Sequence, residues 1–151
     1  MSVLLVVQLV LVGLLAGEEF IVRWGVQPAL SSLPDDAHVR TRIALVKRLK
    51  VVVPILMIPA VLASVAVLVL VTDQSGLEWR IAGVTALAVF VGASFLGTVP
   101  INMGVNDWDA TAPPPDWRRV VTKWERIDVL RSTAAGVAFV LFVIGVVQLL
   151  A

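Results

Sequence analysis

The chain has no cysteine and only one histidine, His38. Without thiols it forms no disulfide, and it has no ligands for an iron–sulfur cluster or a thiolate zinc site. A single imidazole also falls short of the histidine clusters that hold most transition metals. Because no cofactor-binding motif is present either, the sequence predicts no metal and no cofactor, and we expect no nucleic-acid partner.

Charge is also scarce, and this absence is more informative. Charged residues make up only 15% of the 151 residues, 59% are hydrophobic, and the mean hydropathy is +0.96. The apolar residues form long uninterrupted runs, which is typical of a membrane protein and not of a soluble core. Crossing a bilayer core of about 30 Å takes roughly 20 apolar residues. The predicted spans are 3–30, 51–72, 80–101 and 132–151.

Four spans use most of the chain, so we expect a single transmembrane domain over residues 1–151, folded as an all-α polytopic four-helix bundle. Lys and Arg concentrate in loops 31–50 and 102–131, whereas the loop between the second and third spans has only Arg80. The positive-inside rule therefore predicts that both basic loops are cytoplasmic and both termini non-cytoplasmic. The expected location is the bacterial cytoplasmic membrane.

The first basic loop also contains a helix start. Pro34 suits the first turn of a helix, and Asp35 and Asp36 are favourable near its positive end. We expect this helix to run through the basic stretch into the second span and to bend at Pro54 and Pro59.

The first span is unusual because it carries charges near its predicted cytoplasmic end. At about 100° per residue, Glu19, Arg23 and Gln27 form one polar stripe that continues from Gln8. Glu19 and Arg23 are also in the favourable i,i+4 order for an ion pair. Glu18 points about 100° away from Glu19, so we rank it second.

Two further segments direct polar side chains toward the same end of the bundle. The third span and its extension carry four polar residues at intervals of four, which share one helix face. These residues are Ser94, Thr98, Asn102 and Asn106. The segment before the fourth span has a similar face at i, i+4 and i+7. It consists of Trp124, Asp128 and Arg131.

These residues have two interpretations. They either anchor the helices at the membrane interface, or they line a polar pocket that opens toward the cytoplasmic leaflet. In a pocket, a carboxylate removes a proton from a weak carbon or phenol acid, and guanidinium and amide groups hold the resulting oxyanion. The candidate catalytic residues are Glu19 and Asp128. The candidate substrate-binding residues are Arg23, Gln27, Asn102, Asn106, Trp124 and Arg131.

Essentially the whole chain resembles a known family, most clearly in its second half. The segments "VPINMGVNDW" and "PPPDWRRVVTKWERIDVLR", followed by an apolar helix, are similar to the DUF1772 or anthrone oxygenase-like family of small four-helix membrane proteins. Pro100, Ile101 and Asn102 match the end of its third span, and Trp124 and Arg131 match the stretch before its fourth. The first loop, with "VQPAL" and a following "LP", also fits. The chain departs from the pattern at Lys123, where Arg is usual, and at Asp128, where His is typical.

The resemblance implies a tailoring enzyme of aromatic polyketide biosynthesis, which oxidises an anthrone to an anthraquinone with molecular oxygen and without a metal or flavin. The expected substrate is flat, phenolic and lipophilic, and reaches the site from the bilayer. A base-catalysed cyclisation or isomerisation is a related activity. The alternative is a non-catalytic membrane protein, either an assembly scaffold or an amphiphile-binding transporter, and a transporter of this size would need to form a homo-oligomer.

Overall fold

The structure, a computed structural model that describes residues 2–151, consists of helices joined by short loops. The elements are α1 (Ser2–Ile21), the π-helical turn η1 (Val22–Val26), α2 (Gln27–Ser31), α3 (Asp35–Leu70), α4 (Leu77–Ala93), the π-helical turn η2 (Ser94–Thr98), α5 (Val99–Asn106) and α6 (Trp117–Leu150). Because η1 and η2 continue the helices on either side, the elements form four long rods. The predicted all-helical four-helix architecture is confirmed.

Each of the four rods is long and apolar enough to cross a membrane. Many apolar side chains face outward, among them Val3, Leu96 and Leu150, whose exposed fractions are 76%, 86% and 76%. A surface of this kind favours lipid over water, since soluble proteins rarely expose large apolar patches. The fold is therefore that of an integral membrane protein, while the side on which each end lies stays a prediction from the basic residues.

Two rods are much longer than a bilayer is thick. Helices α3 and α6 contain 36 and 34 residues, which correspond to about 50 Å at 1.5 Å per residue, against a bilayer core of about 30 Å. Their charged halves continue as helix beyond the apolar layer, so segments 31–50 and 102–131 are largely helical. Helix α3 begins directly after Pro34 and contains Pro54 and Pro59, as the sequence predicts.

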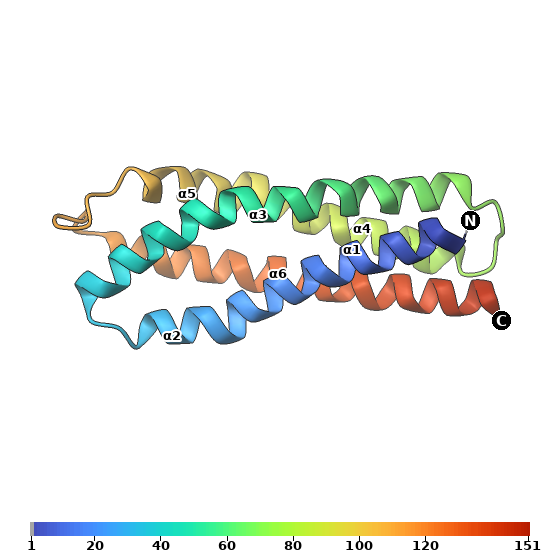
Figure 1. Cartoon of the computed structure of the whole chain (residues 1–151), viewed down its shortest axis with the longest axis horizontal. Helices are drawn as coiled ribbons and strands as arrows, with labels where there is room; N and C mark the ends of the chain where they lie inside the picture. Colours follow the sequence, from blue (N-terminus) through green and yellow to red (C-terminus); the bar gives the residue numbers. More distant parts are fainter. Residues whose placement is uncertain (1) are drawn as a thin grey trace.

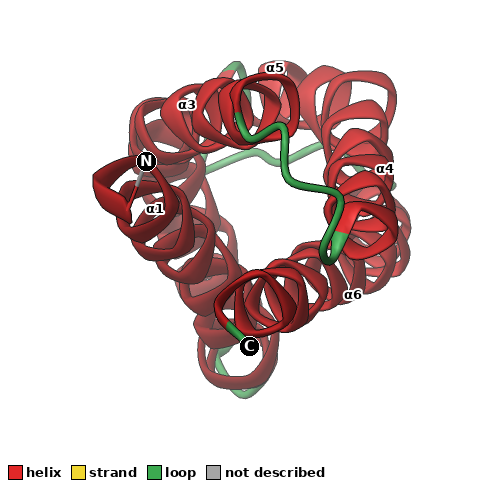
Figure 2. Cartoon of the chain, turned by 90° about the vertical axis from the view of Figure 1, so that its right-hand side faces the viewer, coloured by secondary structure: helices red, strands yellow, loops and turns green. Residues whose placement is uncertain are grey.

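The rods form an antiparallel ring. Both termini lie at the same end of the bundle as the loop between α3 and α4, and the other two loops lie at the opposite end (Figure 1). Seen along the bundle, α1 packs between α3 and α6, and α4 packs between the same two helices on the other side (Figure 2). The rods that contain the two π-helical turns therefore lie diagonally across the ring.

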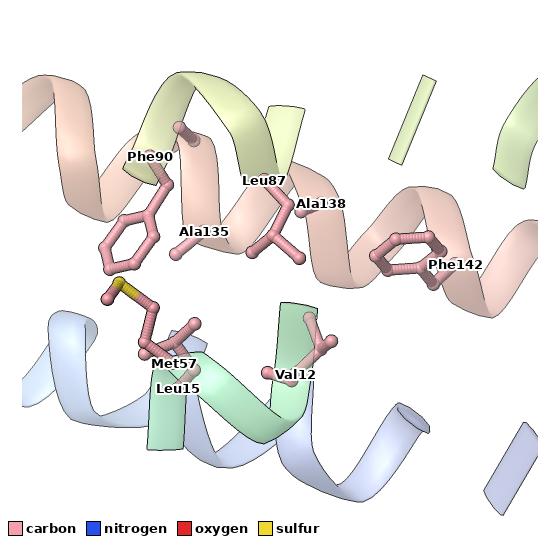
Figure 3. Close-up of a cluster of buried hydrophobic side chains, with 10 residues drawn as sticks. Val12, Leu15, Met57, Leu87, Phe90, Ala135, Ala138 and Phe142 are labelled. Atoms are coloured by element: carbon pink, nitrogen blue, oxygen red, sulfur yellow. The ribbon is translucent and has the colours of Figure 1, made fainter. Parts of the chain in front are cut away.

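The main hydrophobic core lies in the half of the bundle nearer the termini and takes side chains from α1, α3, α4 and α6. Figure 3 shows these side chains packed together. Leu15 from α1, Phe90 from α4 and Ala135 from α6 are among the members of this core, and each is at most 2% exposed. These residues come four positions before Glu19, four before Ser94 and four after Arg131. The core is thus one helical turn from the polar residues and closes the bundle on that side of them.

The loop near the termini is held by a buried arginine. Arg80 is 1% exposed, and its guanidinium donates to the carbonyl oxygens of Val71, at 2.9 Å, and Asp73. Arg80 therefore has a structural contact that its place in the charge pattern did not predict.

Gly76 precedes α4 with φ of 68°, where a Cβ would lie 2.6 Å from the carbonyl oxygen of Gly145.

We predict that Gly83→Ala destabilises the protein, because the added Cβ would lie 2.6 Å from the buried ring of Phe142. Overpacking of this kind costs about 1–3 kcal/mol. Gly92→Ala on the same helix is the matched control, since nothing lies within 4 Å of its Cβ position. Thermal unfolding of both variants in detergent measures the difference. Equal midpoints would contradict the close packing of α4 against α6.

Candidate functional site

A cavity of about 300 Å³ lies between the rods, on the side of the core away from the termini. Its apolar wall comes mainly from α3, η2 and α5. Its polar lining consists of Glu18, Glu19, Lys50, Ser94, Thr98, Asn102, Asn106, Trp124 and Arg131. All four polar residues that the sequence places on one face of the third span therefore line one cavity with Glu19 and Arg131, whereas Arg23, Gln27 and Asp128 do not line it.

Arg131 is the centre of the polar cluster at the inner end of this cavity. Its Nη2 donates to Glu19 Oε1 at 2.5 Å, its Nη1 to Asp128 Oδ1 at 3.4 Å, and its Nε to Ser94 Oγ at 2.9 Å. The exposed fractions are 5% for Arg131 and 1% for each carboxylate residue. The guanidinium also lies over the ring of Phe90, 5.2 Å from its centroid. One buried cation thus bonds two carboxylates from different helices.

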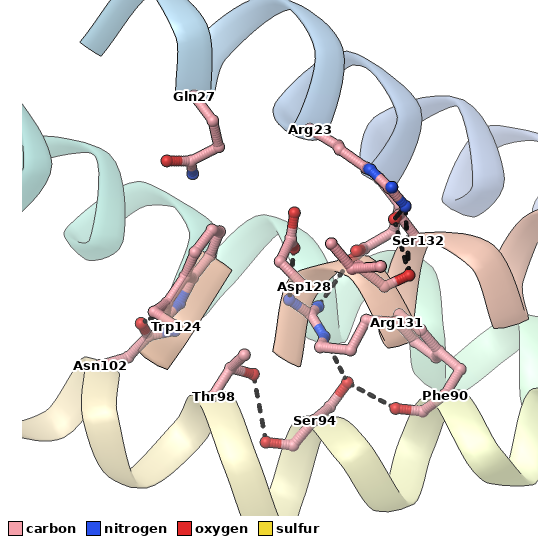
Figure 4. Close-up of polar contacts among 12 residues, drawn as sticks. Arg23, Gln27, Phe90, Ser94, Thr98, Asn102, Trp124, Asp128, Arg131 and Ser132 are labelled. Atoms are coloured by element: carbon pink, nitrogen blue, oxygen red, sulfur yellow. Dashed lines mark hydrogen bonds and ion pairs between the residues drawn. The ribbon is translucent and has the colours of Figure 1, made fainter. Parts of the chain in front are cut away.

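The turn η2 positions the hydroxyl groups in this cluster (Figure 4). Ser94 Oγ accepts the bond from Arg131 and donates to the carbonyl oxygen of Phe90 at 2.8 Å, while Thr98 Oγ1 donates to the carbonyl oxygen of Ser94 at 3.2 Å. Pro100 follows two residues after η2. Because proline lacks an N–H and its ring crowds the carbonyl four residues earlier, a wider π-helical turn accommodates it without breaking the rod.

The outer end of the cavity has amide groups and an aromatic ring. The indole Nε1 of Trp124 donates to Asn102 Oδ1 at 2.9 Å. Asn106 Oδ1 is buried and has no hydrogen-bond partner among the described residues. Lys50 from α3 is the exposed cation on the same lining. Polar groups therefore lie at both ends of the cavity, with apolar walls between them.

The cavity opens between α3 and the η2–α5 segment. The exposed residues of its lining all belong to these elements, and besides Lys50 they are Phe95, Val99 and Met103. Their exposed fractions are 56%, 39% and 65%. In a bilayer, the apolar part of this rim, formed by Phe95, Val99 and Met103, faces lipid.

A family model for anthrone oxygenase matches residues 44–141, which is more than half of the chain. The chain belongs to the anthrone oxygenase family. This membership supports an oxygenase-like role at the level of the family. The matched range contains Ser94, Asn102, Trp124 and Arg131 but not Glu18 or Glu19. No curated protein and no solved structure matches the chain significantly.

The predicted ion pair between Glu19 and Arg23 is wrong in this family member. Glu19 bonds Arg131 instead, and Arg23 Nη1 donates to Ser132 Oγ at 3.0 Å and to the carbonyl oxygen of Val129 at 3.2 Å. The physical reason is η1, which begins at Val22 and turns the chain more widely than an α-helix. Arg23 therefore points to the outer side of α6 and does not line the cavity (Figure 4).

The expectation that Glu18 faces away from the site is also wrong. Glu18 lines the same cavity as Glu19, although the two side chains leave the helix in different directions. A single polar stripe implies a site on one narrow face of α1. Since α1 packs between α3 and α6, the cavity extends over a wider face and takes in both carboxyl groups.

Asp128 and Gln27 lie behind the cavity. Both line a neighbouring shallow groove between the first rod and α6, on the other side of Arg131. Gln27 Oε1 accepts a hydrogen bond at 2.7 Å from Nη2 of Arg42 on α3. Asp128 therefore reaches the cavity only through its contact with Arg131.

Sequence analysis missed Arg42, which is 2% exposed. Its Nε donates to His38 Nε2 at 3.3 Å, and its guanidinium lies over the ring of Trp124, 5.3 Å from the centroid. The signal available was its position beside the apolar residues Val39 and Ile43, which share the buried face of α3.

We predict that Arg131→Met strongly destabilises the protein, because it leaves Glu19 and Asp128 buried without their cation. Removing one partner of a buried ion pair costs about 3–5 kcal/mol. Arg118→Met is the matched control, since Arg118 bonds Asp35 at the exposed surface, where a pair contributes about 0–1 kcal/mol. Denaturant titration in detergent measures both. Similar small losses in the two variants would show that the buried cluster is not a structural constraint.

Proposed function

We propose that this protein is a membrane-embedded tailoring enzyme of polyketide biosynthesis, which oxygenates an anthrone-like phenolic substrate in the cavity between its helices. The observation that carries the proposal is a cavity with apolar walls in which carboxylates and a guanidinium meet at one end. A flat aromatic molecule suits the walls, and a weak carbon or phenol acid suits the charged end. Membership of the anthrone oxygenase family supports an oxygenase-like role at the level of the family.

The substrate enters from the bilayer in this proposal. The opening between α3 and the η2–α5 segment has an apolar rim, so a lipophilic molecule reaches the cavity without crossing water. Most of the basic residues lie at the end of the bundle to which the cavity extends. By the positive-inside rule, the site then faces the cytoplasmic leaflet.

The reaction needs only the substrate and molecular oxygen. A cavity carboxylate takes one proton from the reactive CH₂ carbon, and the resulting carbanion, stabilised as an oxyanion, adds O₂ at that carbon. The proton returns to the distal oxygen to form a hydroperoxide. Loss of the second proton from the same carbon, with cleavage of the O–O bond, gives the ketone and water. The anthrone is oxidised to a quinone, and one oxygen atom of O₂ is reduced to water.

The residues of the cavity take distinct roles in this scheme. Of the two catalytic candidates predicted from the sequence, Glu19 lines the cavity. Asp128 lies behind Arg131. Each nitrogen of Arg131 has one partner, but a guanidinium carries five N–H bonds, so donors remain for an oxyanion. Asn102 and Asn106 supply amide groups for the phenol substituents at the outer end.

The test is quinone formation by the purified protein in detergent, with an anthrone under oxygen. We expect a rate above the spontaneous background, and a loss on the order of tenfold or more in Val99→Trp, whose bulk narrows the opening and displaces the substrate. Leu96→Trp is the matched control, because Leu96 belongs to the same η2–α5 rod but does not line this cavity. Its rate should equal that of the wild type.

A binding measurement separates catalysis from simple binding. A fluorescent hydroxyanthraquinone, as a product analogue, should bind the wild type and Leu96→Trp and bind Val99→Trp more weakly. Saturable binding without quinone formation above background would overturn the enzyme proposal and favour an amphiphile-binding protein. Failure of both binding and turnover would overturn the anthrone assignment altogether.

A further inference from the structure

Two adjacent carboxyl groups line the cavity, and their surroundings differ. Glu19 Oε1 accepts the bond from Arg131 at 2.5 Å, which ties Glu19 to the only arginine of the cavity lining. Oε2 of each glutamate is buried without a hydrogen-bond partner among the described residues, but Glu18 has no ion pair there. Glu18 is thus the cavity carboxylate that has no ion-pair partner among the described residues.

The charges on the surrounding helices reinforce this difference. On α6, Arg131 is shared between Glu19 and Asp128. On α3, Lys50 is exposed at the rim, and Arg42 bonds Gln27 and His38. The α4–η2–α5 rod contributes hydroxyl and amide groups to the cavity but no titratable side chain. Arg131 and Arg42 therefore form their ion pairs and hydrogen bonds with residues other than Glu18.

We propose that Glu18 is the catalytic base of this site, and that Glu19 is a positioning residue that holds Arg131. This inference rests on the proposed function, because it names the group that removes the carbon-bound proton. The C–H bond breaks, its electron pair stays on the substrate as the oxyanion, and the proton forms an O–H bond to the carboxylate of Glu18.

Two physical reasons favour Glu18 over its neighbour in this role. Protonation of Glu19 would break a buried ion pair and leave Arg131 with less compensation, whereas protonation of Glu18 breaks no ion pair. The transfer also conserves charge within the cavity, since Glu18 becomes neutral as the substrate becomes an anion. Glu19, Asp128 and Ser94 hold Arg131 in place. After the transfer, the substrate oxyanion replaces the Glu18 carboxylate as the negative charge near Arg131.

The experiment measures proton removal separately from oxygenation. An anthrone is incubated under argon with the detergent-solubilised protein in D₂O, and deuterium incorporation at its CH₂ carbon is followed by mass spectrometry against a protein-free background. Without oxygen no quinone forms, so the exchange rate reports the base alone. The same samples are then exposed to oxygen, and quinone formation is recorded.

We expect Glu18→Gln to lose protein-dependent exchange by about 100-fold or more, the usual scale for general-base catalysis. Glu18→Gln should keep its thermal midpoint and its binding of the fluorescent product analogue, and Glu18→Asp should recover part of the exchange rate. Glu19→Gln should lower the thermal midpoint and weaken binding, because Arg131 loses its charged partner. Glu78→Gln, an exposed residue in the first turn of α4 at the other end of the bundle, is the matched control and should behave as wild type.

The possible results test the role of Glu18, the role of Glu19 and the oxygenase proposal separately. Wild-type exchange in a folded Glu18→Gln variant would overturn the assignment of Glu18, and its abolition in Glu19→Gln with binding intact would move the base to Glu19. Exchange that depends on Glu18 without quinone formation in oxygen would support Glu18 as the base and overturn the oxygenase proposal. Absence of protein-dependent exchange in the wild type would overturn both.

Discussion

The structure around the cavity depends on one buried guanidinium. Arg131 bonds Glu19 on α1, Ser94 on η2 and Asp128 on its own helix, so a single side chain ties three of the four rods together. A buried charge is costly unless its hydrogen bonds are satisfied, and a charge within a membrane span is costly even near its end. This constraint makes the relative positions of α1, η2 and α6 specific, and it fixes the groups that would meet a substrate.

The apolar residues and the π-helical turns position this cluster. The core of Leu15, Phe90 and Ala135 lies one turn away and closes the inner end of the cavity, so the polar groups that line the cavity are reached from the opening between α3 and the η2–α5 segment. The turns η1 and η2 lie at the level of the cavity on diagonal rods, and a proline follows each of them. The same local irregularity that accommodates the prolines directs Ser94 inward and Arg23 outward.

Much of the fold could be read from the sequence, because a bilayer imposes a simple length rule. The four apolar runs and the shared face of Ser94, Thr98, Asn102 and Asn106 follow from length and helical period. The start of α3 after Pro34 follows from the proline and the two aspartates that follow it. The partner of Glu19 did not follow, since i,i+4 spacing favours Arg23 and only the tertiary fold brings Arg131 close. The place of Glu18 on the cavity lining did not follow either, because a helical wheel gives a direction but not the width of a cavity. Arg42 was missed because its burial depends on how α3 packs beyond the apolar layer.

The central claim is that the cavity ionises a weak carbon acid beside Arg131. The most direct measurement is the absorption spectrum of an anthrone bound to the wild-type protein under argon, where no oxidation consumes the ligand. The long-wavelength absorption of the ionised form should appear on binding at neutral pH and be absent in Glu18→Gln. A bound anthrone that keeps the spectrum of its neutral form in the wild type would contradict the account.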